Sequence, residues 1–185
     1  MWQKEEETLI PELQEIGALR KVLPYGRYLT TFTELEARFA PNDENRTQIW
    51  RAFQEVTDIL KEVYGRIVAV WFGGSFITSE QTPHDIDVVY LIDGDSYSRA
   101  VSEPYGQFVT HVLLRKNPAV SRLNPLVDAY LFPVPPTDTN IHYNYSVSRG
   151  YWDQFWSKAR FEDGNDRWLY PAAGYLEVII DGYDK

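Results

Sequence analysis

The sequence predicts a small α/β domain, of the mixed α+β kind, in which helices flank a short mixed β-sheet. Two apolar runs, residues 67–72 and 88–92, have the β-branched and aromatic composition of buried strands. Between residues 43 and 63, apolar side chains recur at alternating spacings of four and three, as on one face of a helix. The chain has 185 residues, 44% of them apolar, and is therefore long enough to bury one substantial core.

The first part of the chain is expected to be mainly helical. Residues 1–24 read as a short acidic helix with an irregular lead-in. Thr33, with Glu36 three positions later, fits a capping box that begins a second short helix. The longest predicted helix, residues 43–63, has one apolar stripe made of Ile49, Phe53, Val56, Leu60 and Val63.

The middle of the chain is predicted to alternate strands with turns. Residues 67–72 form a strand buried on both faces. Residues 88–92 form a second strand, which stops at the turn-like sequence of residues 93–96. Beyond that turn the prediction stays open between a strand and a helix, centred on residues 108–114.

The last third is expected to add a strand, an aromatic segment and a final strand. Residues 127–132 form the third strand, and the prolines of residues 133–136 make a stiff extended connection. A further strand is predicted at residues 176–180. Three aromatic residues at helical spacing favour core packing, with base stacking as the alternative: Trp152, Phe155 and Trp156. The chain is thus divided into an N-terminal helical lead-in (1–29), a core (30–132) and a C-terminal extension packed on the core (133–185).

Composition and charge argue against several classes of protein. A net charge of -9 argues against a protein that coats nucleic acid, because that mode of binding needs a basic surface, so any contact with nucleic acid would be local. No apolar run approaches the roughly 20 residues of a membrane span, so no membrane partner is expected. The acidic N-terminus lacks the features of a secretory signal, which favours the cytoplasm. The absence of cysteine excludes disulfides and thiolate zinc sites.

Asp85 and Asp87 stand where the second predicted strand begins. Because side chains alternate on an extended chain, both carboxylates point to one side and Ile86 to the other. Two neighbouring carboxylates resist ionising together unless a cation neutralises them, and such hard oxygen ligands suit magnesium or manganese. A lone Asp-x-Asp is more often a solvated turn, so the interpretation depends on what accompanies it.

The sequence Gly73-Gly74-Ser75 follows directly after the first predicted strand. Glycine lets the backbone approach a ligand closely, and Ser75 adds a hydroxyl group beside exposed N–H groups. A short helix over residues 75–80 would direct its N-terminus at bound phosphates. The strand, the turn and the second strand therefore combine features of a phosphate-binding turn with a pair of carboxylates.

This combination resembles the DNA polymerase beta-like nucleotidyltransferase superfamily. Its motif is an apolar residue, glycine, then glycine or serine, a loop, and an Asp-apolar-Asp triplet that opens a strand. Residues 71–75, WFGGS, and residues 85–88, DIDV, are similar to it in order and spacing. The run GGSFITSEQTPHDIDVVYLID, with FTELEARFAPNDENR before it, looks like a small branch of bacterial and phage proteins in that superfamily. The resemblance covers residues 30–132 and implies a nucleotidyltransferase type of sheet.

The resemblance implies a third carboxylate on a later strand and a site for two metal ions. Asp128 is the acidic residue downstream that apolar, strand-like sequence flanks. Asp85, Asp87 and Asp128 are then the expected catalytic residues and ligands of Mg²⁺ or Mn²⁺. In the superfamily the first two aspartates bind both metals, and the third binds the catalytic metal and helps to activate the attacking hydroxyl group. Gly73, Gly74 and Ser75 are expected to bind the triphosphate of an NTP such as ATP.

One departure from the narrower family concerns the charge near the triphosphate. The position of Glu80 is often a lysine there, so a positive charge would have to come from Arg115, Lys116 or Arg122. Arg115 and Lys116 are therefore included among the expected nucleotide-binding residues. His84, beside the carboxylate pair, is either a proton shuttle or an incidental loop residue.

The expected function is transfer of a nucleoside monophosphate from an NTP to a hydroxyl group on RNA, protein or a small molecule. Superfamily members with so little added structure include toxin-like and antibiotic-modifying enzymes. The resemblance thus suggests a toxin–antitoxin or phage-defence setting with a cognate partner protein. The alternative is an inactive nucleotide-binding or protein-interaction module with the same fold. Retention of both aspartates, Asp85 and Asp87, favours the enzyme.

Overall fold

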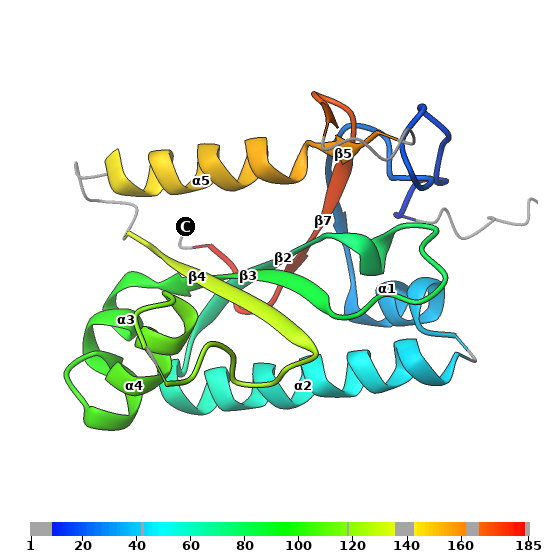
Figure 1. Ribbon diagram of the computed structural model, residues 1–185. Helices are drawn as coiled ribbons and strands as arrows, with labels where there is room; N and C mark the ends of the chain where they lie inside the picture. The colour runs from blue at the N-terminus through cyan, green and yellow to red at the C-terminus, as the bar shows by residue number, and fades with distance from the viewer. Residues whose placement is uncertain (1–8, 42, 118, 136–142, 162–166, 184–185) are drawn as a thin grey trace, which may run out of the picture.

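The computed structural model describes residues 9–41, 43–117, 119–135, 143–161 and 167–183. They form a mixed sheet of five strands with helices on both faces (Figure 1). The expected α+β class with a mixed sheet is thereby confirmed. No helix in the described ranges is both long enough and apolar enough to cross a membrane.

The five-stranded sheet has the order β1-β7-β2-β3-β4. Its strands are β1 (Gly26–Thr30), β7 (Gly174–Ile179), β2 (Ile67–Gly73), β3 (Ile86–Asp93) and β4 (Val127–Val134). Strand β2 runs antiparallel to both of its neighbours, whereas the outer pairs β1–β7 and β3–β4 are parallel. Two short strands, β5 (Ala159–Arg160) and β6 (Trp168–Leu169), form a separate antiparallel ladder.

Helices α1 and α2 each begin after a residue whose side chain caps them. Helix α2 (Glu44–Tyr64) begins after Asp43, whose carboxylate accepts a hydrogen bond from the Arg46 amide at 2.8 Å. Helix α1 (Phe32–Phe39) is capped by Thr31, so the predicted capping box at Thr33 is wrong by two residues although the helix exists. The remaining helices are η1 (Ser75–Ile77), α3 (Gly94–Ala100), α4 (Pro104–Leu113) and α5 (Tyr143–Trp156).

Three further local predictions differ from the structure, and one segment whose prediction was left open is now assigned. Residues 9–25, part of the predicted helical lead-in, contain no helix. The sequence at residues 93–96 begins helix α3 instead of making only a turn, because the Asp93 carboxylate accepts from the Ser96 amide and caps the helix. The open segment around residues 108–114 is helix α4. Pro133 belongs to β4, where an edge strand tolerates its missing N–H.

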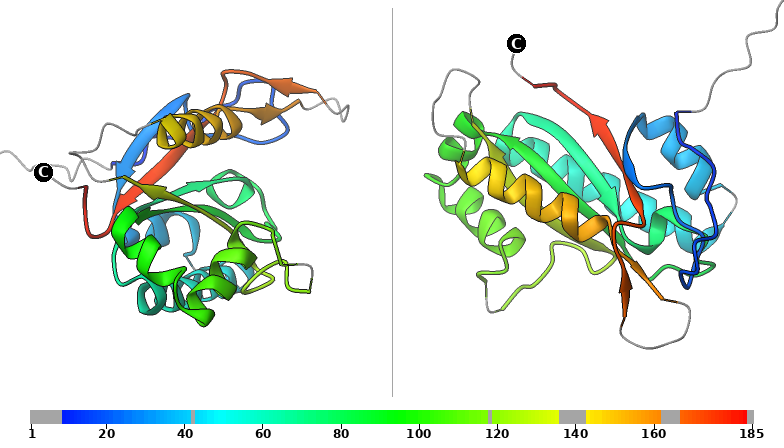
Figure 2. Two further views of the ribbon diagram at one scale, coloured as in Figure 1. Left: turned by 90° about the vertical axis from the view of Figure 1, so that its left-hand side faces the viewer. Right: turned by 90° about the horizontal axis from the view of Figure 1, so that it is seen from above.

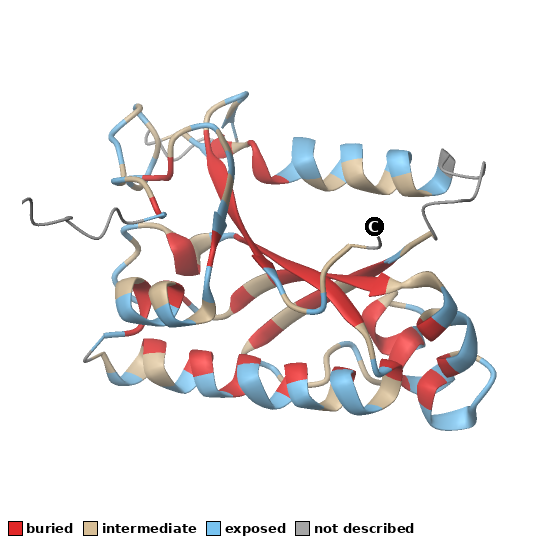
Figure 3. Ribbon diagram, turned by 180° about the vertical axis from the view of Figure 1, so that it is seen from behind, coloured by how far each residue is buried: buried red, intermediate tan, exposed pale blue. Residues whose placement is uncertain are grey.

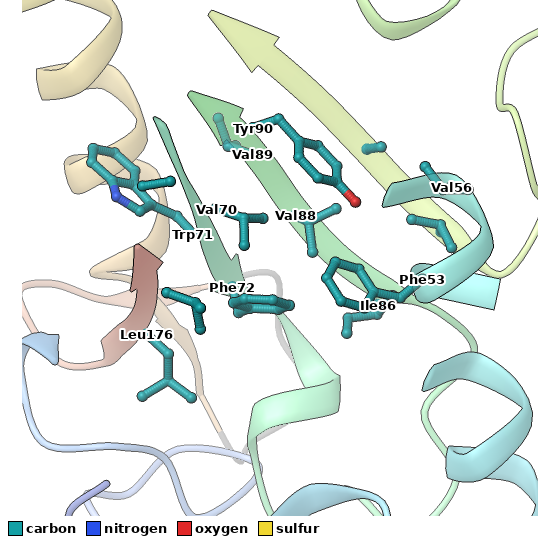
Figure 4. Packing of buried hydrophobic residues seen from close by; sticks show 14 of the residues in the cluster. Phe53, Val56, Val70, Trp71, Phe72, Ile86, Val88, Val89, Tyr90 and Leu176 are labelled. Atoms are coloured by element: carbon teal, nitrogen blue, oxygen red, sulfur yellow. The ribbon is translucent and has the colours of Figure 1, made fainter. Parts of the chain in front are cut away.

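The face of the sheet that packs on α2 is apolar. Strand β2 is buried along its whole length, as predicted, because α2 covers one face and α5 lies over the other (Figures 2 and 3). Phe72 points toward Phe53 of α2 with ring centroids 5.1 Å apart, and Trp71 points to the opposite side (Figure 4). The hydroxyl groups of Tyr90 and Thr57 pair at 2.7 Å, which satisfies two polar atoms inside this core.

The face of the sheet beneath α5 carries polar and aromatic side chains. Glu177 on β7 is only 2% exposed, yet it is a carboxylate. It accepts hydrogen bonds from Trp71 Nε1 at 2.9 Å and from the Tyr183 hydroxyl at 2.6 Å, and Arg27 Nε lies 3.3 Å from it. These partners offset the cost of burying the charge. Tyr175 lies on the same face, against Trp71 and α5.

The C-terminal segment belongs to the interior of the sheet. The predicted strand at residues 176–180 is confirmed as β7. It lies between β1 and β2, with residues 26–30 parallel on one side and residues 69–72 antiparallel on the other. The sheet therefore draws strands from all three predicted segments of the chain.

Candidate active site

Two strands bring the predicted carboxylates together at one end of the sheet. Asp87 on β3 and Asp128 on β4 are direct register partners in the parallel ladder. Neighbouring strands lie about 4.8 Å apart and register partners share a face, so the two side chains project side by side. Asp85 precedes β3 by one residue, and its charge acts on Asp87. The sheet thus places all three predicted aspartates in one cluster.

The glycine turn packs directly against this cluster. Gly73 is the register partner of Asp87 on β2. Gly74 has a φ of +69°, and a Cβ atom there would lie 1.7 Å from Asp87 Oδ2. A Cβ on Gly73 would lie 2.5 Å from the ring of Trp156 at the end of α5. Both glycines are therefore required for close approach, one to the carboxylate and one to the helix that covers it. Ser75 then begins η1, which is shorter than the predicted helix over residues 75–80.

Two arginines from the segment between α4 and β4 pair with two of the three carboxylates. Arg122 Nη1 donates to Asp85 Oδ2 at 2.7 Å, and its Nε lies 3.3 Å from Asp128 Oδ1. Arg115 also donates to Asp128 Oδ1. The Tyr130 hydroxyl donates to Asp128 Oδ2 at 3.2 Å. Among the described residues, Asp128 is consequently held by three side chains and Asp85 by one.

Asp87 differs from its neighbours because it lacks such a partner. No donor in the described part of the chain hydrogen-bonds to its carboxylate. Burial, followed by the negative charges of Asp85 and Asp128, raises the pKa of Asp87 to about 7, and Arg122 opposes this effect. The predicted reluctance of neighbouring carboxylates to ionise together is thus seen at Asp87, which would gain most from a bound cation.

The donor chemistry of the cluster suits a hard divalent cation, but its side chains face arginines. Carboxylate oxygens are the ligands that magnesium and manganese prefer. Among the residues that the structure describes, no group of three His, Cys, Asp or Glu side chains is arranged to hold a metal ion. Asp87 is accessible to a cation as it stands. Asp85 and Asp128 would join it only after Arg122 and Arg115 release them.

A pocket of about 500 Å³ opens beside the cluster, and of the three aspartates Asp87 lines it. Gly74, Ser75 and Asp87 line one part of it. Its other walls come from the N-terminal segment at residues 18–23, from the end of α5 and β5 at residues 155–160, and from Trp168 on β6. A pocket of this volume accommodates a small ligand such as a nucleotide.

The other predicted site residues have different positions. Lys116 is exposed, and within the described residues its side chain has no contact with the carboxylates, unlike Arg115. Glu80 forms an ion pair with Arg20, a pocket residue that sequence reasoning missed. His84 is exposed at the start of the cluster.

The sequence suggested a place in the site for Trp156 and Tyr130 only as possible base-stacking residues, and their contacts with the glycine turn and Asp128 come from the structure. Trp156 covers Gly73, and Tyr130 contacts Asp128. Trp152 packs on Tyr130 with ring centroids 4.8 Å apart, and Trp156 is almost fully buried. In the sequence, the helical spacing of Trp152, Phe155 and Trp156 was the signal for core packing. That prediction holds for Trp152 and Trp156, whereas Phe155 is exposed.

Comparison with known proteins assigns the chain to a family. A model of a family of unknown function, DUF6932, matches residues 18–179. The chain belongs to DUF6932. The match extends from the pocket wall before β1 to the end of β7, so the DUF6932 region includes the glycine turn, the three aspartates and both arginines. No curated protein and no solved structure matches the chain.

Proposed function

We propose that this DUF6932 protein is a metal-dependent nucleotidyltransferase that moves a nucleoside monophosphate from an NTP to a hydroxyl acceptor. The observation that carries the proposal is the register of Gly73, Asp87 and Asp128 on three adjacent strands. This register sets the glycine turn against Asp87, and Gly74 and Asp87 line one pocket. The resemblance of the same residues to the polymerase beta-like superfamily supports the reaction class.

The residues of the pocket have distinct tasks in this reaction. The backbone at Gly74 and the Ser75 hydroxyl group hold phosphate oxygens of the NTP. Asp85, Asp87 and Asp128 would hold Mg²⁺ or Mn²⁺, which supplies positive charge to the transferring phosphoryl group when bound. Release of Arg122 and Arg115 from the carboxylates leaves two guanidinium groups that can pair with phosphate.

The transfer itself exchanges one bond to phosphorus for another. The acceptor oxygen forms a bond to the α-phosphorus of the NTP, and the bond from that phosphorus to its bridging oxygen breaks. Pyrophosphate leaves with the bonding electrons, and the acceptor proton passes to the carboxylate of Asp128. The register of Asp128 beside Asp87 puts that carboxylate next to the residues that hold the phosphates.

The test is transfer of label from each α-labelled NTP in the presence of magnesium or manganese. Purified protein is incubated with total RNA or cell lysate, and the labelled product is identified by nuclease or protease digestion. We expect transfer by the wild type and at least about a hundredfold less by Asp85→Ala/Asp87→Ala, since loss of charge stabilisation has effects of this size.

The matched control removes two carboxylates elsewhere on the molecule. Glu55 and Asp58 are exposed on α2, so Glu55→Ala/Asp58→Ala should retain full transfer. If no NTP yields a labelled product while the wild type still binds nucleotide, the enzymatic proposal is wrong.

A second candidate is a nucleotide-binding module without turnover. The pairing of Asp85 and Asp128 with Arg122 and Arg115 favours it, because internal counter-ions then occupy the place of a metal. Metal-independent binding of nucleotide, equal in wild type and Asp128→Asn, would identify this module. The toxin–antitoxin or phage-defence setting and a cognate partner are proposed on the superfamily resemblance alone.

A further inference from the structure

The outer part of the Asp87 pocket combines cations with exposed aromatic rings. Lys158 Nζ lies 6.0 Å from the centroid of the Phe155 ring, and Arg160 Cζ lies 5.3 Å from that of Trp168. All four side chains line the same pocket as Asp87. We call Phe155, Lys158, Arg160 and Trp168 the cation–aromatic rim.

The rim is built on two elements that hold it open to solvent. Phe155 stands in the last turn of α5 and is 47% exposed, and Trp168 on β6 is 50% exposed. Arg160 and Trp168 are register partners in the β5–β6 ladder, which keeps the guanidinium beside the indole. Large aromatic rings left this exposed at the mouth of a pocket mark a binding surface.

The rim carries two basic side chains in an otherwise acidic molecule. The chain as a whole carries a net charge of -9, whereas Lys158 and Arg160 supply positive charge at the rim. Arg20, which pairs with Glu80, lines the same pocket. A local concentration of cations in an acidic protein selects an anionic ligand at that point.

The combination of flat aromatic faces and cations matches single-stranded nucleic acid. Unpaired bases stack on aromatic rings, and lysine and arginine neutralise the phosphates between them. A duplex does not fit, because its bases are already stacked on one another.

We infer that the cation–aromatic rim binds a single-stranded nucleic acid whose end enters the Asp87 pocket. Binding at the rim stands by itself, but the role of the strand as hydroxyl acceptor rests on the proposed function. Stacking on Trp168 and Phe155 does not read base edges, so binding should depend little on sequence.

The test measures anisotropy of a short fluorescein-labelled oligouridylate with protein, in a chelator and without NTP. We expect Trp168→Ala to weaken binding about tenfold, the effect of losing one stacked base, and Trp168→Phe to retain most of it. Arg160→Gln should reduce the slope of log affinity against log salt by about 0.7, the value for one phosphate on a single strand. Circular dichroism verifies that each variant is folded.

Matched controls lie on the opposite side of the sheet. Tyr105 on α4 is 58% exposed and Arg51 on α2 is exposed, so Tyr105→Ala and Arg51→Gln should leave binding unchanged. Competition with unlabelled single-stranded DNA and with duplex RNA separates the classes of nucleic acid. Strong competition by either single strand and weak competition by the duplex supports the inference.

The inference is overturned if the wild type does not bind the strand at low salt, or if Trp168→Ala binds as well as Tyr105→Ala. Equal labelling of a protein in the lysate by the wild type and by the rim variants would overturn the role of the strand as hydroxyl acceptor. The proposed function fails separately: if the strand binds at the rim and Asp85→Ala/Asp87→Ala binds it equally, but no NTP transfers label, the binding site stands and the enzyme does not.

Discussion

Gly74 and Asp87 fix each other's position in the pocket. The positive φ of Gly74 lets its Cα lie against the Asp87 carboxylate, where no side chain could be accommodated. Asp87 is thereby buried against the turn beside two other carboxylates, and its pKa rises. The glycine and the aspartate consequently contribute to one geometry, and each can be tested by a single substitution.

Gly74→Ala should destabilise the protein by about 1–3 kcal/mol, because the new Cβ would overlap Asp87 Oδ2 and the backbone is unfavourable for alanine. The free energy of unfolding is measured by urea denaturation. Gly150 on α5 is the matched control, since a Cβ there meets nothing within 4 Å. Gly150→Ala should be neutral or stabilising by up to about 1 kcal/mol. Equal stability of the two variants would contradict the close contact.

Asp87→Asn should change how stability depends on pH in metal-free protein. The pKa of Asp87 rises from 3.8 to about 7 on folding, so the folded state holds an extra proton between these values. The free energy of unfolding of the wild type therefore falls with rising pH across that interval, by at most about 1.4 kcal/mol per pH unit. The variant should be more stable than the wild type above pH 7 and lose this advantage below the lower pKa.

Urea denaturation at a series of pH values, in a chelator, measures this difference. The exposed Asp58 is the control, and Asp58→Asn should follow the wild type at every pH. Parallel curves for Asp87→Asn and the wild type would show that folding does not raise the pKa of Asp87.

At the scale of elements, two segments enclose the cluster from opposite sides. The segment between α4 and β4 contributes Arg115 and Arg122, which neutralise two carboxylates. Helix α5 contributes Trp156 over Gly73 and Trp152 over Tyr130. The first segment controls the charge of the site, and the second controls its shape.

Arg122→Gln should strengthen binding of manganese by about three- to fivefold. The guanidinium competes with a cation for Asp85 and Asp128, and an ion pair with a third of the arginine side chain exposed contributes up to about 1 kcal/mol. Isothermal titration calorimetry of metal-free protein measures the affinity. Arg99→Gln, at an exposed arginine of α3, is the control. Unchanged or weaker binding in Arg122→Gln would mean that the arginine does not compete.

Gly73→Ala should weaken nucleotide binding by displacing Trp156, because the added methyl group would overlap the indole ring. Trp156→Leu in the same chain makes room for that methyl group. These substitutions should also lower the free energy of unfolding. We expect the decrease in the double variant to be smaller than the sum of the decreases in the two single variants, by about 0.5–3 kcal/mol in a double-mutant cycle. Additive effects would show that α5 and the turn are independent.

At the scale of the molecule, β7 brings a C-terminal strand next to β1, a strand from the N-terminal part of the chain. It is the neighbour of both β1 and β2, so residues 26–30 join the sheet through a strand from the C-terminus. Tyr175, Leu176 and Val178 are buried. At roughly 1.5–3 kcal/mol for each fully buried side chain, their loss is comparable with the total stability of about 5–15 kcal/mol of a typical domain.

A chain that ends at Ala173 should not fold, since β2 would lose one of its two antiparallel neighbours and β1 would lose its ladder. Circular dichroism should show no cooperative thermal transition. A chain that ends at Tyr183 keeps β7 and the hydrogen bond from Tyr183 to Glu177, and it should unfold cooperatively. A cooperative transition in the shorter chain would mean that the remaining strands form a stable sheet alone.

Local patterns in the sequence were sufficient for the elements that have strong periodicity or composition. Helix α2 and strands β2, β3 and β4 were predicted correctly. An apolar stripe and a β-branched run are both patterns of residues that are close in the sequence, so they can be recognised without the fold. Asp85 and Asp87 were found for the same reason, since the spacing of two residues on a strand determines the face they share. Helix α3 was missed because a cap and a turn use the same residues, Asp and Ser.

The sequence by itself thus determined the long helix, the buried strands, the glycine turn and the first two carboxylates, all of which are properties of adjacent residues. Only the tertiary structure decided that Asp128 lies in register with Asp87 and that Arg122 and Arg115 neutralise the cluster. The tertiary structure alone placed β7 inside the sheet. It also placed Phe155 and Trp168 of the cation–aromatic rim at the pocket. Strand order and ion pairing depend on contacts between distant segments, and a local pattern carries no information about which segments will meet.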